Sequence, residues 1–237
     1  MREARASKSG WLLPVAVAAV GLAVWAGIAG LKIFLPSVFP PPLAVAAGFV
    51  EEVRSGRWVH DLIASLFRVS WGFLLAAVTS IPLGLWLGRH LRARTALLPT
   101  VNFFRNLSPL AWIPFSLLWF GIGDAPAIFL VFMASFFPLL LAVIAAVANI
   151  PAVHFQVARD YGFKGPELLY RVTLPAIMPQ VITALRVTAG VAWMVIVAAE
   201  MIGVKAGLGY AIWDARNGLR SDLLVSAMIS IGVVGVL

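Results

Sequence analysis

Long apolar segments recur along the whole chain, and short polar segments separate them. Of the 237 residues, 62% are hydrophobic and 12% are charged, which is more apolar surface than a soluble domain can bury. A helix needs about 20 apolar residues to cross the hydrocarbon core of a bilayer. The sequence therefore predicts an all-α polytopic membrane protein with about six transmembrane helices, at 11–31, 62–88, 98–120, 126–149, 180–203 and from 222 onward.

The first and last apolar segments need separate interpretation. The last one stops at Leu237 after about 15 apolar residues, so we expect the sequence to end inside its final helix. The first one has an alternative interpretation as a cleaved signal peptide. It is longer than the usual apolar core of about 7–15 residues, however, and no small-x-small site precedes Lys32. We therefore expect an uncleaved first helix.

The distribution of basic residues predicts the topology. The net charge is +8. The N-terminal segment 1–10, a loop predicted at 89–97 and the segment 150–179 hold nine Lys and Arg residues, whereas the segments expected on the external side hold six. Arg2, Arg5 and Lys8 make the N-terminus basic. Because Lys and Arg concentrate on the cytosolic side of membrane proteins, we expect the N-terminus in the cytoplasm. The same rule explains the charge better than nucleic-acid binding does.

A proline-rich external segment follows the first span. The pattern at 43–55 predicts an amphipathic helix at the outer interface, which Gly56 ends. The chain then divides into 1–61, with the tail, the first helix and the external segment, and a core at 62–237.

The span at 98–120 is the least regular of the six. Pro99, Pro109 and Pro114 interrupt it, and its first half is polar. Broken helices persist at membrane depth only where protein or a water-filled cavity satisfies the freed backbone groups. This span is therefore the candidate translocation pathway. The tentative pathway residues are Asn102, Arg105, Asn106, Ser108, Trp112 and Glu200.

Two of these residues have alternative interpretations. Arg105, expected near the inner end of its span, either reaches cytosolic headgroups, which we favour, or lies near a permeating anion. Glu200 either lies at the outer headgroup level, which we favour, or acts in gating or helix pairing. Gly84 and Gly88 have the spacing of a small-residue packing face, but such pairs arise often by chance.

A polar interruption at about 150–179 separates two apolar spans. Pro151 suits a first helical turn, and Gly162 suits the end of a helix where a positive φ is needed. Gly165 and Pro166 then favour the start of a second helix. The segment therefore predicts a helix-turn-helix hairpin outside the bilayer.

The hairpin carries more apolar residues than a solvated loop needs. Pro175 and Pro179 are expected to end or kink its second helix. A long loop with its own helices and exposed hydrophobic residues usually binds a partner. An inert connector packed on the bundle is the alternative. The apolar residues are Val153, Phe155, Val157, Tyr161 and Phe163.

The hairpin sequence resembles the EAA loop of permease subunits of ABC importers. Gly162, nine further residues and 172–175 (VTLP) follow its G-x9-I-x-L-P pattern. Of its Glu-Ala-Ala, which falls at 156–158, only Ala158 matches strictly. In such permeases this loop is the coupling helix that docks into a groove of the cytosolic ATPase. The coupling residues that the resemblance implies are Gln156, Val157, Ala158, Arg159, Asp160, Tyr161, Gly162, Phe163, Leu174 and Pro175.

Three further stretches, 65–88, 104–123 and 198–217, look like the branch of these permeases that serves nitrate, sulfonates, taurine and bicarbonate. The resemblance implies a type I importer permease fold in the bacterial cell (inner) membrane that carries a small anion. It also implies a second permease subunit, alike or different, two ABC ATPase subunits, and a periplasmic or lipid-anchored binding protein.

Catalytic and cofactor motifs are missing from the sequence. There is no G-x4-G-K-[ST] loop, so ATP and Mg²⁺ are expected on the partner ATPase and the chain itself is not expected to be an enzyme. The chain has no Cys, and His60, His90 and His154 have no metal-binding spacing. The alternative function is an ATP-independent secondary transporter or channel. It would need an inverted repeat or a line of ionisable residues at the midplane, and the sequence shows neither.

Overall fold

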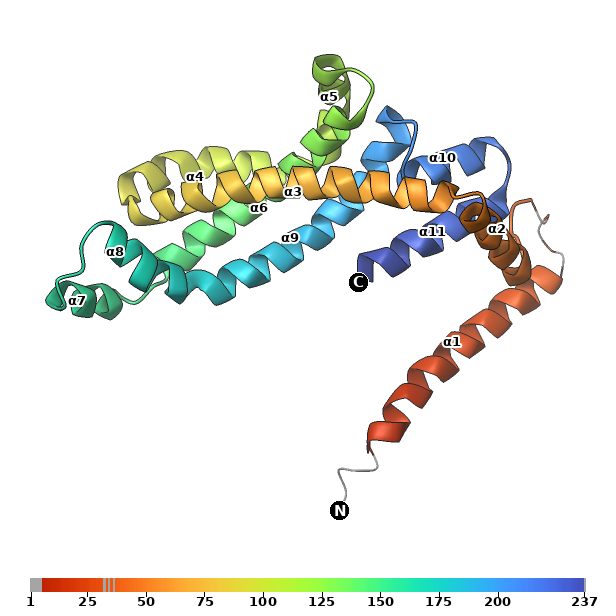
Figure 1. The fold of residues 1–237 in the computed structure, drawn as a ribbon, viewed down its shortest axis with the longest axis horizontal. Coiled ribbons are helices and arrows are strands. Elements are labelled where there is room, and N and C mark those ends of the chain that lie inside the picture. Colours follow the sequence, from red (N-terminus) through yellow and green to blue (C-terminus); the bar gives the residue numbers. More distant parts are fainter. Residues whose placement is uncertain (1–5, 32, 34, 36, 237) are drawn as a thin grey trace. The chain divides into compact units, whose positions relative to one another are not determined.

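The computed structural model describes residues 6–31, 33, 35 and 37–236, with side chains described from Leu13 onward. This part of the chain consists of helices joined by short connections (Figure 1). The elements are α1 (Ala6–Gly30), α2 (Pro42–Arg54), α3 (Arg57–Arg89), α4 (Leu91–Asn106), η2 (Pro109–Trp112), α5 (Ile113–Phe120), α6 (Asp124–Ala148), α7 (Ala152–Asp160), α8 (Pro166–Leu168), η3 (Leu169–Thr173), α9 (Leu174–Gly203), α10 (Leu208–Asn217) and α11 (Ser221–Val236). Outside the described residues or side chains lie Arg2, Arg5, Lys8, Lys32, Pro36 and Leu237.

The predicted all-α architecture is confirmed. Among the described residues, four helical segments are long and apolar enough to cross a membrane, and two shorter apolar ones lie within the other two predicted spans. The four are Leu13–Gly30, Arg57–Arg89, Asp124–Ala148 and Pro166–Gly203, and the shorter ones are Pro109–Phe120 and Ser221–Val236.

Two sequence-based expectations between α3 and α5 are wrong. The predicted span at 98–120 is not one helix, because α4 ends at Asn106 and the backbone is extended at Ser108 (ψ 128°) before Pro109. Proline disfavours a helical conformation in the residue before it. The predicted loop at 89–97 is also wrong, because α4 already begins at Leu91. Only His90 breaks the helical path there, with φ −108° and ψ 91°.

The chain divides into two compact units, residues 1–61 with 211–237, and residues 62–210. In the first unit α2 packs closely against α11, since a Cβ atom at Gly48 would lie 3.0 Å from Leu223 Cδ2. Arg220 donates a hydrogen bond from Nη2 to Glu51 Oε2 at 2.9 Å. A hydrogen bond to Asp222 and this bond to Glu51 raise the pKa of the Arg220 guanidinium above its usual value.

The helix predicted at 43–55 is α2. Gly56, predicted to end it, has a φ of +76°, in the left-handed region that favours glycine. Both expectations are confirmed.

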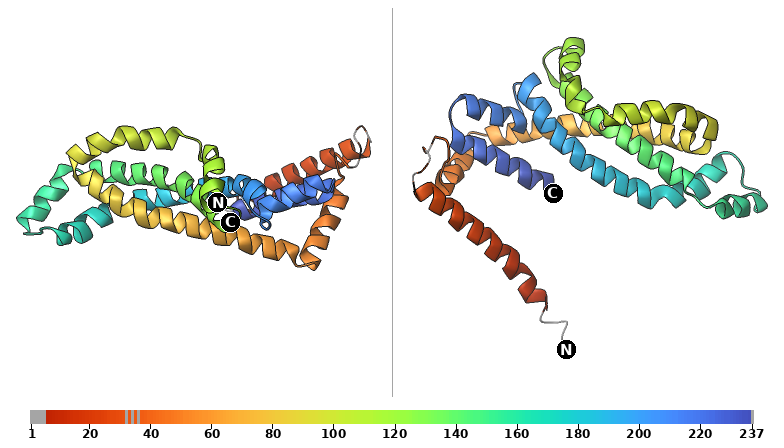
Figure 2. Two further views of the ribbon diagram at one scale, coloured as in Figure 1. Left: turned by 90° about the horizontal axis from the view of Figure 1, so that it is seen from above. Right: turned by 180° about the vertical axis from the view of Figure 1, so that it is seen from behind.

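In the second unit α6 and α9 lie side by side, as the views of Figures 1 and 2 agree. Apolar side chains from both helices form a buried cluster. It contains Leu139, Val143, Ala146 and Val147 of α6 with Ile177 and Val181 of α9.

Helix α3 packs against α6 through a ridge of small residues. A Cβ atom added at Gly84 would lie 2.7 Å from Val143 Cβ, and one at Gly88 would lie 2.5 Å from Val147 Cβ. Backbones this close leave no room for a side chain. The packing face that the sequence suggested is therefore used within this chain. The ridge recurs every fourth residue, at Gly72, Ala76, Ser80, Gly84 and Gly88.

Candidate functional site

The predicted hairpin begins with a short helix and a glycine turn. Helix α7 ends at Asp160, and Gly162, two residues later, has a φ of +81° in the left-handed region. The Gly162 N–H donates to the Arg159 carbonyl at 2.8 Å, and the Phe163 N–H donates to the Ala158 carbonyl at 2.9 Å. This pair of bonds is a Schellman motif, which satisfies the last carbonyls of the helix. The predicted glycine stop is confirmed.

The returning half of the hairpin differs partly from the prediction. Gly165 (φ +53°) and Pro166 start α8 as expected. Pro175 and Pro179 do not end the second helix, because the chain passes through the π-helical turn Leu169–Thr173 directly into α9. A π turn is wider than an α turn, and it lies just before Pro175, whose ring would clash with the preceding turn of an α-helix. The hairpin is therefore joined to α9 by continuous helical backbone.

One face of α7 is apolar and exposed. Ala158 is 4% exposed and Phe155 is half-buried. Val153, Val157 and Tyr161 follow each other at four-residue spacing and are 61%, 48% and 78% exposed. Residues four apart lie on the same side of a helix. We call these three residues the α7 ridge.

The other coupling residues implied by the resemblance lie around the α7 ridge and at the base of the hairpin. The Phe163 ring stacks against Tyr161 with centroids 6.5 Å apart, and the Arg171 guanidinium lies 5.3 Å from the Phe163 centroid. Leu174 and Pro175 begin α9. The role of this set in coupling stays a prediction. Three polar members are exposed beside the ridge, namely Gln156, Arg159 and Asp160.

Two of the tentative pathway residues, Asn102 and Arg105, line an open groove of about 620 Å³ between α4 and α6. Arg105 does not lie near the inner end of its span. The neighbouring Phe104 ring stacks on Phe137 of α6 with centroids 5.4 Å apart, which places Arg105 beside the middle of α6. The expectation differed because α4 begins several residues earlier than predicted.

The other predicted residues of this region lie apart from the groove. Asn106 is exposed at the end of α4, and Ser108 is exposed in the break that follows. Trp112 packs among aromatic rings, with its centroid 6.2 Å from Phe104 and 6.4 Å from Phe129. Their membership in a pathway stays a prediction.

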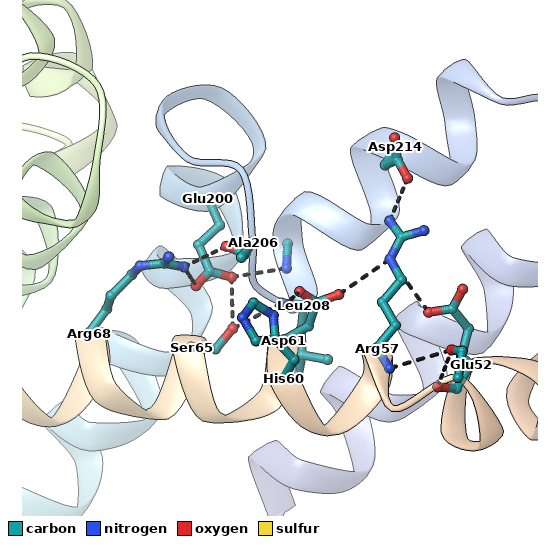
Figure 3. Close-up of polar contacts among 12 residues, drawn as sticks. Glu52, Arg57, His60, Asp61, Ser65, Arg68, Glu200, Ala206, Leu208 and Asp214 are labelled. Carbon is teal, nitrogen blue, oxygen red and sulfur yellow. Dashed lines mark hydrogen bonds and ion pairs between the residues drawn. The ribbon is translucent and has the colours of Figure 1, made fainter.

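Glu200 is enclosed in a polar cluster that the sequence did not predict (Figure 3). Its carboxylate is 0% exposed and accepts hydrogen bonds from Arg68 Nη1 at 2.6 Å, Ser65 Oγ at 2.8 Å and the Gly209 N–H at 3.0 Å. These contacts are those of helix pairing, which was the alternative interpretation, and the position of Glu200 at the outer headgroup level stays a prediction. Any part of Glu200 in translocation stays a prediction.

The same cluster fixes the connection after α9. Arg68 donates from Nε to Asp124 Oδ1 at 2.7 Å and from Nη1 to the Ala206 carbonyl at 2.6 Å. Ser65 Oγ accepts a bond from the Leu208 N–H at 2.9 Å. The cluster thus ties α3, the start of α6, the end of α9 and the start of α10 together. The sequence contained one signal that could have revealed this cluster. Arg68 and Glu200 carry opposite charges within apolar spans, and charges in such spans need partners.

No metal site is evident in the part of the chain that the structure describes, where no three His, Cys, Asp or Glu side chains are grouped to hold an ion.

The known proteins that this chain resembles are all permease components of transport systems. Residues 80–237 match the family model described as binding-protein-dependent transport system inner membrane component. The taurine transport system permease protein TauC of Escherichia coli is 32% identical over 95% of this chain and 84% of its own length. The nitrate import permease protein NrtB of Leptolyngbya laminosa is 37% identical over 75% of this chain and 63% of its own. The bicarbonate transport system permease protein CmpB of Synechococcus elongatus is 38% identical over 74% of this chain and 63% of its own length.

A solved structure shares the fold. A chain of the MetNI methionine ABC transporter in inward-facing conformations superposes with a TM-score of 0.59 over 72% of this chain and 87% of its own length. The two sequences are 20% identical.

Proposed function

Since this chain belongs to the family of binding-protein-dependent transport system inner membrane components, we propose that its hairpin is the contact through which a cytosolic ATPase drives transport. Members of this family are the non-catalytic permease subunits of ABC importers. ATP and its Mg²⁺ accordingly belong to the partner ATPase. Family membership also removes the support for an ATP-independent transporter.

The observation that carries the coupling proposal is the exposed α7 ridge. Three apolar side chains on a rigid, capped helix would be unfavourable in water unless another protein covers them. Val157, at the centre of the ridge, is 48% exposed, whereas the adjacent Ala158, which points in a different direction from the helix axis, is 4% exposed. A groove in a globular partner fits such a helix better than lipid does, because Arg159 and Asp160 lie beside the ridge.

The charge distribution supports a cytosolic position for the hairpin. The contact of Gly88 with Val147 brings the end of α3 to the end of α6, from which α7 follows. Arg89, Arg92 and Arg94 lie at this same end of the second unit. Under the positive-inside rule we place this end in the cytosol, and by the same rule we propose a cytoplasmic N-terminus.

A continuous helical path supports a lever mechanism. Because η3 joins α8 to α9 without a loop, a displacement of the hairpin moves the cytosolic half of α9 with it. Closure of two ATPase subunits on ATP binding would then rock the permease between inward-facing and outward-facing states. Such a shift requires contacts that differ between the two states, and the hairpin contact supplies them.

The transported substrate is proposed to be a small anion. The relatives are named for taurine, nitrate and bicarbonate, and each of these carries an anionic group. The proposed assembly contains a second permease subunit, identical or related, two ATPase subunits and a periplasmic or lipid-anchored binding protein that selects the anion.

The test is co-purification of the ATPase with variants of the permease in detergent. Val157→Asp introduces a charge on the α7 ridge and is expected to abolish retention of the ATPase without lowering the amount of permease in the membrane. Ile122→Asp is the matched control, since Ile122 is 80% exposed in the turn between α5 and α6 at the opposite end of α6. Equal retention of the ATPase by the two variants would refute the coupling role of the ridge.

A further inference from the structure

Arg105 lies at the centre of the membrane-spanning part of the second unit. Its neighbour Phe104 stacks on Phe137, and Val101 one turn earlier packs with Leu140 and Ile144. Phe137 is close to the middle of the 25-residue helix α6. At about 1.5 Å rise per residue, Arg105 is roughly 15–20 Å from either end of that helix.

Two open grooves meet on α6 at this depth. One is lined by Asn102 and Arg105 of α4, and the other by Gln180 and Thr183 of α9. Both grooves share Pro138 and Ala142, so they open onto the same strip of α6. We call the surface formed by the two grooves the α4–α6–α9 strip.

A second arginine flanks this strip. Arg186 lies between Thr183 and Val187, which both line the α9 groove opposite Pro138 and Ala142, and its side chain is exposed. The backbones of Arg105 and Arg186 therefore lie near the same depth, on the two helices that pack against α6, and of the two side chains Arg105 lines its groove.

Neither arginine has a carboxylate partner. Within the described part of the chain no ion pair involves Arg105 or Arg186. None of the ten Asp and Glu residues of the sequence lies in the middle of a candidate span. A second copy of this chain therefore offers no carboxylate at this depth either.

The membrane interior makes such a position costly. Placing an arginine at the centre of a spanning helix costs about 2.5–3.5 kcal/mol on insertion scales, and such residues face protein or a water-filled cavity. The headgroup phosphates lie at the membrane surface, roughly 15 Å from the middle of the hydrocarbon core. A mobile anion in water is the countercharge that fits both constraints.

We propose that the α4–α6–α9 strip is a transient binding station for the transported anion, with Arg105 and Arg186 supplying the positive charge and Asn102 and Thr183 supplying hydrogen bonds. The inference rests on the proposed importer function and adds a second site to it, inside the permease. The geometry suits a small anion with several oxygen atoms, because guanidinium groups donate paired hydrogen bonds to such groups.

The absence of cysteine from the sequence allows a direct test. Arg105→Cys is introduced alone, and the assembled complex in lipid nanodiscs is treated with two water-soluble methanethiosulfonates, one with a sulfonatoethyl group and one with a trimethylammonioethyl group. Rates are expressed relative to a free thiol in the same buffer. Because Arg186 remains, the anionic reagent is expected to react about tenfold faster than the cationic one.

Two variants control the comparison. Val78→Cys lies on α3 near the depth of Phe137, given the contact of Gly84 with Val143, and position 78 is 62% exposed away from the strip. This variant is expected to react with neither water-soluble reagent. In Arg105→Cys combined with Arg186→Gln, the preference for the anionic reagent is expected to fall to about that of a free thiol.

Three results would overturn the proposal. These are reaction of the Arg105→Cys variant only with a lipid-soluble maleimide, equal or faster reaction of that variant with the cationic reagent, or the same anionic preference in the Val78→Cys variant. Retention of the ATPase is measured in the same preparations. If the unmodified complex does not retain the ATPase, the result counts against the proposed function. If the complex is intact but the thiol at position 105 does not distinguish the anionic from the cationic reagent, the result counts against the binding station alone.

Discussion

Arg68 Nη1 and Glu200 Oε1 lie 2.6 Å apart in an ion pair that is closed off from solvent, with the two residues 4% and 0% exposed. The pair joins helices that are more than 130 residues apart in the sequence. Its carboxylate also accepts the Gly209 N–H, so the connection between α9 and α10 depends on it. A buried pair of this kind stabilises only when both partners are present.

Glu200→Ala is expected to lower the free energy of unfolding by about 3–5 kcal/mol, because Arg68 stays buried and loses its main countercharge. The double variant Arg68→Met with Glu200→Leu is expected to be more stable than Glu200→Ala, since no buried charge is left unpaired and Asp124, which loses Arg68, is exposed to solvent. Thermal denaturation in detergent, followed by size-exclusion chromatography, measures both. If the single and double variants lose equal amounts of stability, the unpaired charge of Arg68 is not the cause of the destabilisation.

Gly207→Ala is expected to destabilise the same cluster. A Cβ atom at Gly207 would lie 2.5 Å from the Glu200 carboxylate oxygens, and its φ of +124° is unfavourable for any other residue. The control is Gly190→Ala in α9, where no atom lies within 4 Å and alanine improves helix propensity by about 1 kcal/mol. The midpoint of thermal denaturation should fall for the first variant and rise or stay unchanged for the second. A fall of equal size in both would contradict a local clash.

Gly84→Ala is expected to separate α3 from α6 and to cost about 1–3 kcal/mol by overpacking, because its Cβ would lie 2.7 Å from Val143 Cβ. Adding Val143→Ala removes the opposing methyl groups and should restore part of the lost stability. The comparison is the midpoint of thermal denaturation of the single and paired variants. If the second substitution only adds further loss, the two residues are not in contact.

Gly162→Val is expected to leave membrane insertion intact and to weaken ATPase co-purification, since a left-handed residue other than glycine costs about 1–2 kcal/mol and Val is among the least tolerant. Gly162→Asn is the matched control, because Asn adopts this conformation more readily. ATPase retention and transport are measured together. Unaltered transport by Gly162→Val would argue against the role of the hairpin.

The sequence correctly predicted those features that are set by a few adjacent residues. The helix stops at Gly56 and Gly162 follow from backbone preferences at single positions, and the structure gives positive φ at both glycines. The apolar lengths predicted the spans for the same reason. The resemblance of the hairpin to the EAA loop was also carried by adjacent residues.

Expectations about how deep a residue lies in the membrane, or about whether a helix continues, were less accurate. Arg105 was expected near the inner end of its span because the start of α4 was placed too late, and a helix start is a weak signal when Arg92 and Arg94 are good helix formers. Pro175 was expected to end a helix that a π turn allows to continue. Each error came from a boundary, where neighbouring conformations differ little in energy.

The sequence by itself determined that this protein is a helical membrane permease with a hairpin of the EAA type, because apolar length, glycine stops and short motifs act over a few neighbouring residues. Only the tertiary structure decided that Glu200 pairs with Arg68 and that Arg105 lies beside the middle of α6. Those relationships depend on which helices pack together and in what register. Packing of this kind is set by contacts summed over whole helix faces, such as the small-residue ridge from Gly72 to Gly88 against α6.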